Sequence, residues 1–375
     1  MFVSNQQTPF FIFVIKQNQT SISWNGYSEQ RIHPNLDGLR GLAILLVLVH
    51  HTPKFDLGGL WLNGRMGVAI FFAISGFLIC SLFYREVRKH DRVHLKAFFV
   101  RRFARLMPLY YAVLAFEAFL VLWLKTYSPE NQDLFVYKLP SYLFYYSNWL
   151  EVMTQGPFFV AWSLAVEEQF YLVFAFVFAF WRKWIAPLAL LLLAIKIYLT
   201  NHAGFPVLMS ELPWRIILSY SEPILLGVGL AVILEHRSSF ERVAGILSHR
   251  ASLLGSSAVV LIMIFAVPVE NTTSWTAQLF YVATILMIGG MVLAGPLPVL
   301  HGNLMRSVGR VSYCIYLIHM PVYNVLKRFS EQHLWLLVVG GAVTYGIALL
   351  SYRFFETPWI KLGRKVSKRL IASSS

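Results

Sequence analysis

Long apolar runs separated by short polar connections make up most of this chain. Several of them approach or exceed the 18 residues that span a hydrocarbon core, which indicates membrane-crossing helices. The shortest, residues 137–150, contains Leu139-Pro140 and is rich in Tyr and Asn, so we interpret it as a re-entrant or interfacial segment. The pattern predicts an all-α fold, a polytopic transmembrane helical bundle with about ten spanning helices plus that segment. The predicted helices cover residues 36–52, 65–84, 105–124, 137–150, 158–181, 184–200, 214–234, 251–269, 275–295, 308–329 and 333–355.

The composition agrees with a membrane protein that has little room for a separate soluble domain. Of the 375 residues, 57% are hydrophobic and 13% are charged, whereas about a quarter of a soluble domain is charged. The net charge of +14 comes from Lys and Arg between apolar runs and at the C-terminus, so it indicates membrane topology and not nucleic-acid binding. Cys80 and Cys314 lie inside apolar runs, which favours reduced packing residues and predicts no disulfide framework and no metal site.

The distribution of basic residues predicts the orientation in the membrane. Eight Lys and Arg fall between Arg85 and Arg105, and five more fall between Lys361 and Arg369, so both segments are expected in the cytoplasm. An even number of spans must then separate them, which gives ten spans with both termini cytoplasmic. We expect residues 1–30 to be a poorly ordered or peripheral extension, 31–360 the membrane domain, and 361–375 a basic cytoplasmic tail.

His51 closes the first apolar run and shares a helix face with Arg40, eleven positions earlier and about 16 Å away. Asp37 lies close to the same face. Ionisable groups inside a membrane helix are costly and mark functional sites. An imidazole can take a proton from a hydroxyl, although an interfacial histidine at a helix end is an equal alternative. The adjacent His50 points about 100° away and is favoured as the structural one of the two.

Arg102 and Arg105 lie three residues apart just before Pro108, so they are neighbours on one helix. Two converging guanidinium groups suit the oxygens of a phosphate. The alternative is that these arginines only follow the positive-inside rule, by which Lys and Arg are enriched on the cytoplasmic side of a membrane. This rule explains most basic residues of the segment. The pair is harder to explain in that way because it directly abuts an apolar span.

Two adjacent glutamates, Glu167 and Glu168, interrupt the apolar helix that begins near Trp162. Ser163, Glu167 and Tyr171 are four residues apart and therefore share a face, whereas Glu168 points elsewhere. A buried glutamate can relay protons or orient an imidazole. The alternative is a structural ion pair with an arginine of another span.

A third polar face lies near the end of the chain, where Ser312, Tyr316 and His319 align on one side of a helix. His319 is a candidate second acid or base, or a contact to the substrate. A buried histidine that donates to a neighbouring helix is an equally good explanation.

Taken together, these segments resemble acyltransferase family 3, the bacterial membrane O-acyltransferases that modify cell-surface sugars. The resemblance covers nearly the whole chain after residue 30, with the motifs in the family's order. The matching segments are LDGLRGLAILLVLVHH (36–51), FFAISGFLI (71–79), RRFARLMP (101–108), WSLAVEEQFY (162–171), SYCIYLIHMPV (312–322) and YRFFETP (352–358).

The resemblance implies transfer of an acyl group, usually acetyl, from cytoplasmic acyl-CoA to a hydroxyl of an extracytoplasmic or lipid-linked acceptor. The family pattern of Arg or Lys, ten residues, then His selects Arg40 and His51, although His50 stands where the family more often has an aromatic residue. The pattern also marks Arg102, Arg105 and Glu167. Acyl-CoA would be a co-substrate, and no tightly bound cofactor is implied.

The combined hypothesis gives each candidate residue a role. We expect His51, Glu167 and Asp37 to be catalytic, with His51 as general base or transient acyl acceptor, and Arg40, Arg102 and Arg105 to bind the CoA phosphates. The expected substrate contacts are Trp162, Ser163, Tyr171, Tyr316 and His319.

The expected partners are acyl-CoA, a carbohydrate or lipid-linked glycan and membrane lipid, with no nucleic acid. The location is the bacterial cytoplasmic (inner) membrane. The chain is expected to lack the soluble hydrolase-like domain of some family members, so a second transfer step would need a separate periplasmic partner or a homo-oligomer. The rival hypothesis is a proton-coupled membrane transporter that uses the same buried charges.

Overall fold

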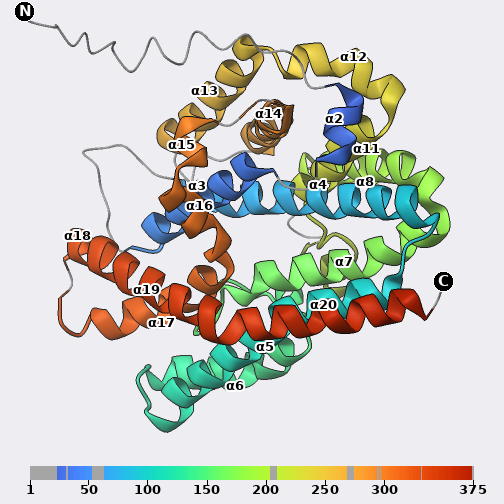
Figure 1. The fold of residues 1–375 in the computed structure, drawn as a ribbon. Coiled ribbons are helices and arrows are strands. Elements are labelled where there is room, and N and C mark those ends of the chain that lie inside the picture. Colours follow the sequence, from blue (N-terminus) through green and yellow to red (C-terminus); the bar gives the residue numbers. More distant parts are fainter. Residues whose placement is uncertain are drawn as a thin grey trace, which may run out of the picture.

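The computed structural model describes residues 23–30, 33–52, 63–202, 209–267, 274–293, 295, 297–330 and 332–373, which form helices and no strand (Figure 1). The predicted all-α class is therefore confirmed. The α-helices are α2 (Trp24–Glu29), α3 (Pro34–His50), α4 (Arg65–His90), α5 (Leu95–Ala118), α6 (Pro129–Leu143), α7 (Ala161–Trp181), α8 (Ile185–Thr200), α10 (Leu212–Ile217), α11 (Glu222–Glu235), α12 (Arg237–Leu247), α13 (Arg250–Ala266), α14 (Ser274–Leu293), α15 (Pro298–His301), α16 (Asn303–Arg310), α17 (Ser312–Leu326), α18 (His333–Trp335), α19 (Gly341–Ser351) and α20 (Thr357–Ala372).

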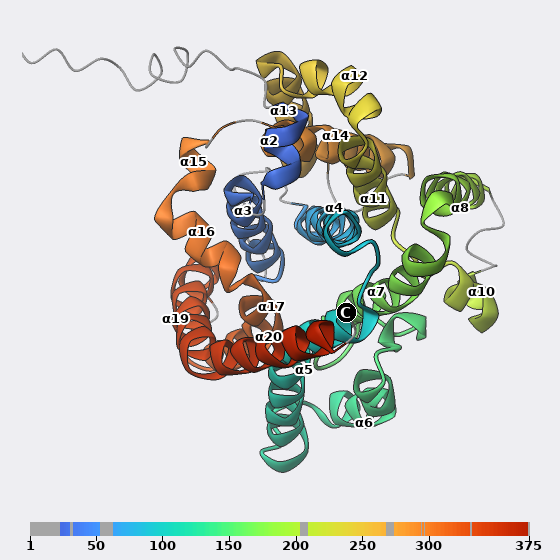
Figure 2. The same cartoon turned by 45° about the vertical axis from the view of Figure 1, so that its right-hand side comes forward.

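Helix α4 is the central element, and Figure 2 shows it surrounded by helices from both ends of the chain. It packs against α3, α7, α11 and α14. The closest approach is to α11, because Gly76 and Gly227 bring the two backbones together. A Cβ atom on Gly76 would collide with the backbone of Ile224, and one on Gly227 with that of Ala73. Small residues commonly permit such close packing between membrane helices.

The helices indicate a multi-pass membrane protein, but the predicted count of ten spans is not confirmed. Among the described residues, six helical stretches are long and apolar enough to cross a bilayer, or seven if α12 and α13, bent by 75°, act as one. Residues 161–200 form one of the six and contain two helices, α7 and α8, joined by the 3₁₀ turn Arg182–Trp184. The 40 residues of this stretch are enough in total for two crossings. Helix α3 has 17 residues and α17 has 15, which is shorter than a full span. Helix α6, which holds part of the predicted re-entrant segment, is not among the six.

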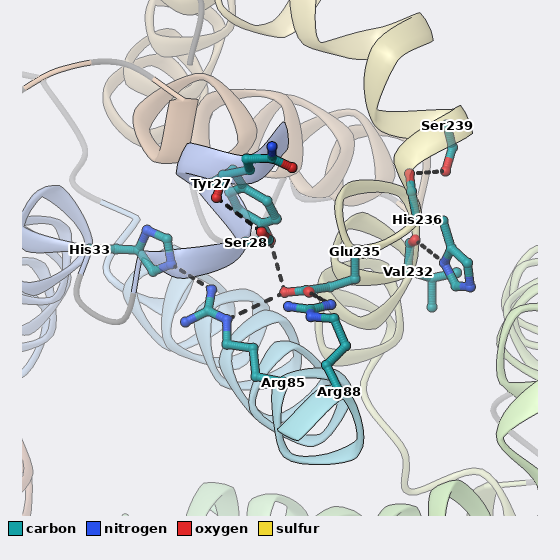
Figure 3. Close-up of polar contacts among 10 residues, drawn as sticks. Tyr27, Ser28, His33, Arg85, Arg88, Val232, Glu235, His236 and Ser239 are labelled. Atoms are coloured by element: carbon teal, nitrogen blue, oxygen red, sulfur yellow. Dashed lines mark hydrogen bonds and ion pairs between the residues drawn. The ribbon is translucent and has the colours of Figure 1, made fainter. Parts of the chain in front are cut away.

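Helix α2, from the predicted N-terminal extension, is held on the bundle by a buried polar cluster (Figure 3). Tyr27 is fully buried and donates its hydroxyl to Glu235 Oε1 at 3.1 Å. Arg88 reaches Glu235 Oε2 at 2.6 Å, and Arg85 lies 3.6 Å from Oε1. Arg85 also contacts His33 Nε2 at 3.2 Å. This arginine cluster ties α2 and α11 to the end of α4. Residues 1–22 lie outside the described residues.

The predicted basic tail is helical through Ala372 and lies along α5 (Figure 1). Gly363 faces Ala104 of α5, and Arg101 donates to the buried Ser367 hydroxyl at 2.6 Å. The opposite face of α20 carries the exposed basic side chains. These are Lys361, Arg364, Lys365, Lys368 and Arg369.

We expect Glu235→Ala to destabilise the protein, because it leaves two arginines at a buried site without their carboxylate. Removing one partner of a buried ion pair costs about 3 kcal/mol or more. The measurement is the melting temperature of the purified protein in detergent. The matched control is Glu241→Ala, whose partner Arg237 is exposed, and it should leave the melting temperature unchanged. Equal melting temperatures for the two variants would contradict a stabilising arginine cluster.

Candidate active site

A cavity of about 300 Å³ lies between α3, α4, α5, α7 and α17. The α4 residues that line it extend from Val68 near one end of the helix to Arg85 near the other. These positions are seventeen residues apart, which corresponds to about 26 Å along the helix axis. The cavity is therefore long and narrow, and it begins at the arginine cluster that holds α2.

Three further arginines line this cavity, Arg40 from α3 and Arg102 and Arg105 from α5. None of the three forms an ion pair with any described carboxylate. Arg40 donates to Ser312 Oγ at 3.3 Å. The guanidinium carbon of Arg102 lies 3.4 Å from the centroid of the Tyr171 ring, as in a cation–π contact. Four arginines, counting Arg85, and one carboxylate, Glu167, line the cavity, so it carries a net positive charge that suits an anion.

Glu167 is the acidic side chain of the cavity, and α7 presents it one turn from Ser163 and Tyr171, which line the cavity as well. It accepts hydrogen bonds at Oε1 from the Ser75 hydroxyl and from the Tyr171 hydroxyl, the latter at 3.3 Å. The predicted common face of Ser163, Glu167 and Tyr171 is therefore present. Two hydroxyl donors fix the carboxylate, which is what a positioned proton acceptor needs.

A pair of hydroxyls lies where α7 meets α17. The Ser163 and Tyr316 oxygens are 2.7 Å apart, and the Tyr316 hydroxyl also lies 3.1 Å from the Val160 carbonyl oxygen. Both side chains are buried and line the cavity. Gly67 on α4 lies against Val47 of α3, one turn before His51, and the next residue of α4, Val68, lines the cavity.

His51 and His319 contact each other directly, with 3.0 Å between His51 Nδ1 and His319 Nε2. Neither imidazole lines the cavity. Tyr316 connects them to it, because its ring lies 5.9 Å from that of His319, centroid to centroid. The two histidines, predicted as separate candidates on α3 and α17, thus form one site that a single side chain separates from the cavity.

Besides the two histidines, two further predicted site residues, Asp37 and Trp162, do not line the cavity. Asp37 lies in the first turn of α3, three residues before Arg40 and so about 60° around the helix, where its backbone carbonyl faces Gly309. Trp162 packs edge-on against Phe72, with 6.3 Å between ring centroids, outside the cavity lining. The His50 ring lies edge-on to that of His51, with 5.1 Å between centroids, but has no hydrogen bond to His319.

The cavity also contains polar residues that the sequence analysis missed. Ser75 holds Glu167, Arg85 lines the end of the cavity near α2, and Tyr313 donates its hydroxyl to the Leu106 carbonyl at 3.0 Å. Arg85 had been assigned to membrane topology. Ser75 could have been found from the sequence, because its hydroxyl interrupts the apolar run of residues 71–79.

Comparison with known proteins shows the family of the chain. A family model described as an acyltransferase domain matches residues 33–353, which is most of the chain. The chain belongs to acyltransferase family 3. The match includes every residue of the cavity named above and both histidines.

Two curated relatives illustrate the family. The peptidoglycan O-acetyltransferase OatA of Listeria monocytogenes is 28% identical over 90% of this chain and 57% of its own length. The O-acetyltransferase OatA of Staphylococcus aureus is 28% identical over 89% of this chain and 58% of its own length. The chain therefore spans less than three fifths of either relative. No solved structure matches. Within the described residues, no three His, Cys, Asp or Glu side chains are grouped to hold a metal ion.

Proposed function

We propose that this family member transfers an acetyl group from acetyl-CoA to a hydroxyl of a cell-wall or cell-surface glycan. One observation carries the proposal. Three arginines without ion-pair partners converge on a narrow cavity that extends along α4 toward the level of a histidine pair. A thioester donor needs these two features, an anion site for its nucleotide and a base at some distance from it.

The arginines suit the phosphates of CoA. Guanidinium groups bind phosphate oxygens through paired, charge-assisted hydrogen bonds. Arg102 and Arg105 come from one face of α5 and Arg40 from α3, so they approach a bound anion from two sides. The cavity, about 26 Å along α4, gives the pantetheine arm room to extend between α4 and α7.

His51 is the general base of the proposed reaction. It takes the proton of the acceptor hydroxyl while that oxygen attacks the thioester carbonyl carbon. The new C–O bond forms, the C–S bond breaks, and the CoA thiolate leaves. The imidazolium then returns the proton to the sulfur. Glu167 and the Ser163–Tyr316 hydroxyl pair, which line the cavity beside the histidines, orient the reacting groups.

The acceptor follows from the relatives, one of which is named a peptidoglycan O-acetyltransferase. We therefore propose a glycan hydroxyl of peptidoglycan as the first acceptor to test. In the proposed orientation, both termini and the basic end of the cavity face the cytoplasm of a bacterium, and His51 lies toward the outer side of its cytoplasmic membrane. Acyl-CoA is then a co-substrate that binds from inside.

The test uses the purified chain in lipid vesicles with acetyl-CoA labelled in the acetyl group and soluble peptidoglycan fragments. We expect thiol release that depends on the fragments, and an equal amount of alkali-labile label on the glycan. Release of neither product, together with movement of protons or a solute across the vesicle membrane, would favour a transporter and contradict the proposal. Vesicles without protein provide the background rate.

A further inference from the structure

We infer that His319 is a positioning residue that sets which nitrogen of His51 acts as the base. The inference rests on the proposed function for the role of His51. The tautomers themselves follow from the hydrogen bonds alone. His319 holds the proton of His51 on Nδ1, and this leaves Nε2 of His51 as the nitrogen that accepts the proton of the acceptor hydroxyl.

The first step concerns Nδ1 of His319. This nitrogen lies 2.8 Å from the Tyr316 carbonyl oxygen and 3.2 Å from that of Ile315. Carbonyl oxygens only accept hydrogen bonds, so Nδ1 must carry a proton. A neutral imidazole has one N–H, and its other nitrogen is an acceptor. Nε2 of His319 therefore presents a lone pair.

The second step concerns His51. Its Nδ1 lies 3.0 Å from Nε2 of His319, and a hydrogen bond between them needs one proton. Because His319 Nε2 is the acceptor, His51 Nδ1 is the donor. The remaining nitrogen of His51, Nε2, then has a free lone pair. The hydrogen bond that joins His51 to His319 is made by Nδ1 and does not involve Nε2.

The surroundings hold both rings in this arrangement. His319 is fully buried, so water cannot replace its partners. The Tyr323 ring lies edge-on to His319 at 6.1 Å, and the Tyr323 hydroxyl contacts the Leu48 carbonyl on α3 at 3.4 Å. Phe159 packs edge-on against the His51 ring at 5.5 Å. Helices α3 and α17 are thus joined beside the pair.

The arrangement resembles that of a catalytic triad, in which a carboxylate accepts the Nδ1–H of the catalytic histidine and so orients it. Here the neutral imidazole of His319 takes the place of that carboxylate. During transfer the acceptor hydroxyl loses its proton to His51 Nε2. The resulting imidazolium keeps Nδ1–H on His319 Nε2, which strengthens that hydrogen bond. The proton on Nε2 then goes to the departing CoA sulfur, and both histidines return to their starting forms.

A direct test is ¹⁵N NMR of histidine-labelled protein in lipid at a pH where both imidazoles are neutral. The His51 signals are assigned by comparison with H51Q. We expect the non-protonated shift at His51 Nε2 and the protonated shift at His51 Nδ1. A protonated Nε2 and a bare Nδ1 in the wild-type protein would overturn the inference, whatever the protein's activity.

Three substitutions at His319 test its role in transfer. The H319Q side chain extends an amide oxygen toward the position of Nε2 and retains an acceptor for His51. H319N is too short to do so, and H319A has no acceptor. We expect kcat to fall less than tenfold in H319Q and roughly a hundredfold or more in H319N and H319A, the scale of losing an orienting partner. The KM for acetyl-CoA should stay unchanged, since His319 lies outside the cavity.

Equal kcat values for H319Q and H319A would overturn the positioning role, provided that the three variants match the wild-type melting temperature. Failure of the inference is distinguishable from failure of the proposed function. If the wild-type protein transfers no acetyl group but its His51 is protonated on Nδ1, the pairing stands and the reaction is wrong. If transfer occurs and the tautomer is reversed, the reaction stands and the pairing is wrong.

Discussion

Replacing His51 by alanine is expected to abolish acetyl transfer while acetyl-CoA still binds. His51 is the imidazole that His319 contacts at 3.0 Å, whereas the arginines that would hold the donor lie elsewhere along the cavity. Losing a general base costs about 10² to 10⁴ in rate. The measurements are glycan-bound label and the dissociation constant of acetyl-CoA, both on protein in lipid vesicles.

His50→Ala is the matched control, because it removes an imidazole one position away that has no hydrogen bond to His319. It should retain activity within a few fold of the wild type. This comparison also decides between the two adjacent histidines. Full transfer by His51→Ala, at normal protein levels, would rule out the proposed base, and loss of transfer in His50→Ala alone would assign the base to His50.

The double substitution of Arg102 and Arg105 by glutamine is expected to weaken acetyl-CoA binding at least a hundredfold. Both guanidinium groups line the cavity, and neither forms an ion pair with a described carboxylate. One hydrogen bond to a charged group contributes about 1.5–3 kcal/mol. Glutamine keeps a polar side chain of similar length but removes the charge. Equilibrium binding of labelled acetyl-CoA to the purified protein measures the effect.

The control for this pair is Arg364→Gln, together with Lys365→Gln. These residues are exposed on α20, so the net charge changes equally without touching the cavity. The control should bind acetyl-CoA as the wild type does, and wild-type binding should weaken as salt is added. Unchanged affinity in the Arg102/Arg105 variant would exclude these arginines as the phosphate site.

Local spacing predicted much of the candidate site. The alignment of Ser163, Glu167 and Tyr171 depends only on helix geometry, so the sequence alone located a face that lines the cavity. The clustering of Arg102 and Arg105 followed from the same rule. Asp37 was assigned to the site by the same argument and does not line the cavity. Its part of α3 packs against α16, where the Asp37 carbonyl faces Gly309, and spacing along one helix does not reveal such a neighbour.

Contacts between distant segments could not be predicted in this way. His51 and His319 are 268 positions apart, and helical periodicity gives no information about which helix faces which. The number of membrane-spanning helices could not be predicted from the sequence either. Helix α3 has only 17 residues, and α12 and α13 are bent by 75° where they meet. A hydropathy pattern records how apolar a segment is and not where its helix ends or bends.

The thin separation between the cavity and the histidine pair has a bioenergetic consequence. Tyr316 lines the cavity on one side and neighbours His319 on the other. In the proposed reaction, only the thioester end of the donor reaches the histidine pair, while the polyanionic nucleotide stays with the arginines. Such a vectorial reaction would export an ester without moving the nucleotide through lipid. It also needs no continuous water-filled path, through which ions would cross and dissipate the membrane potential.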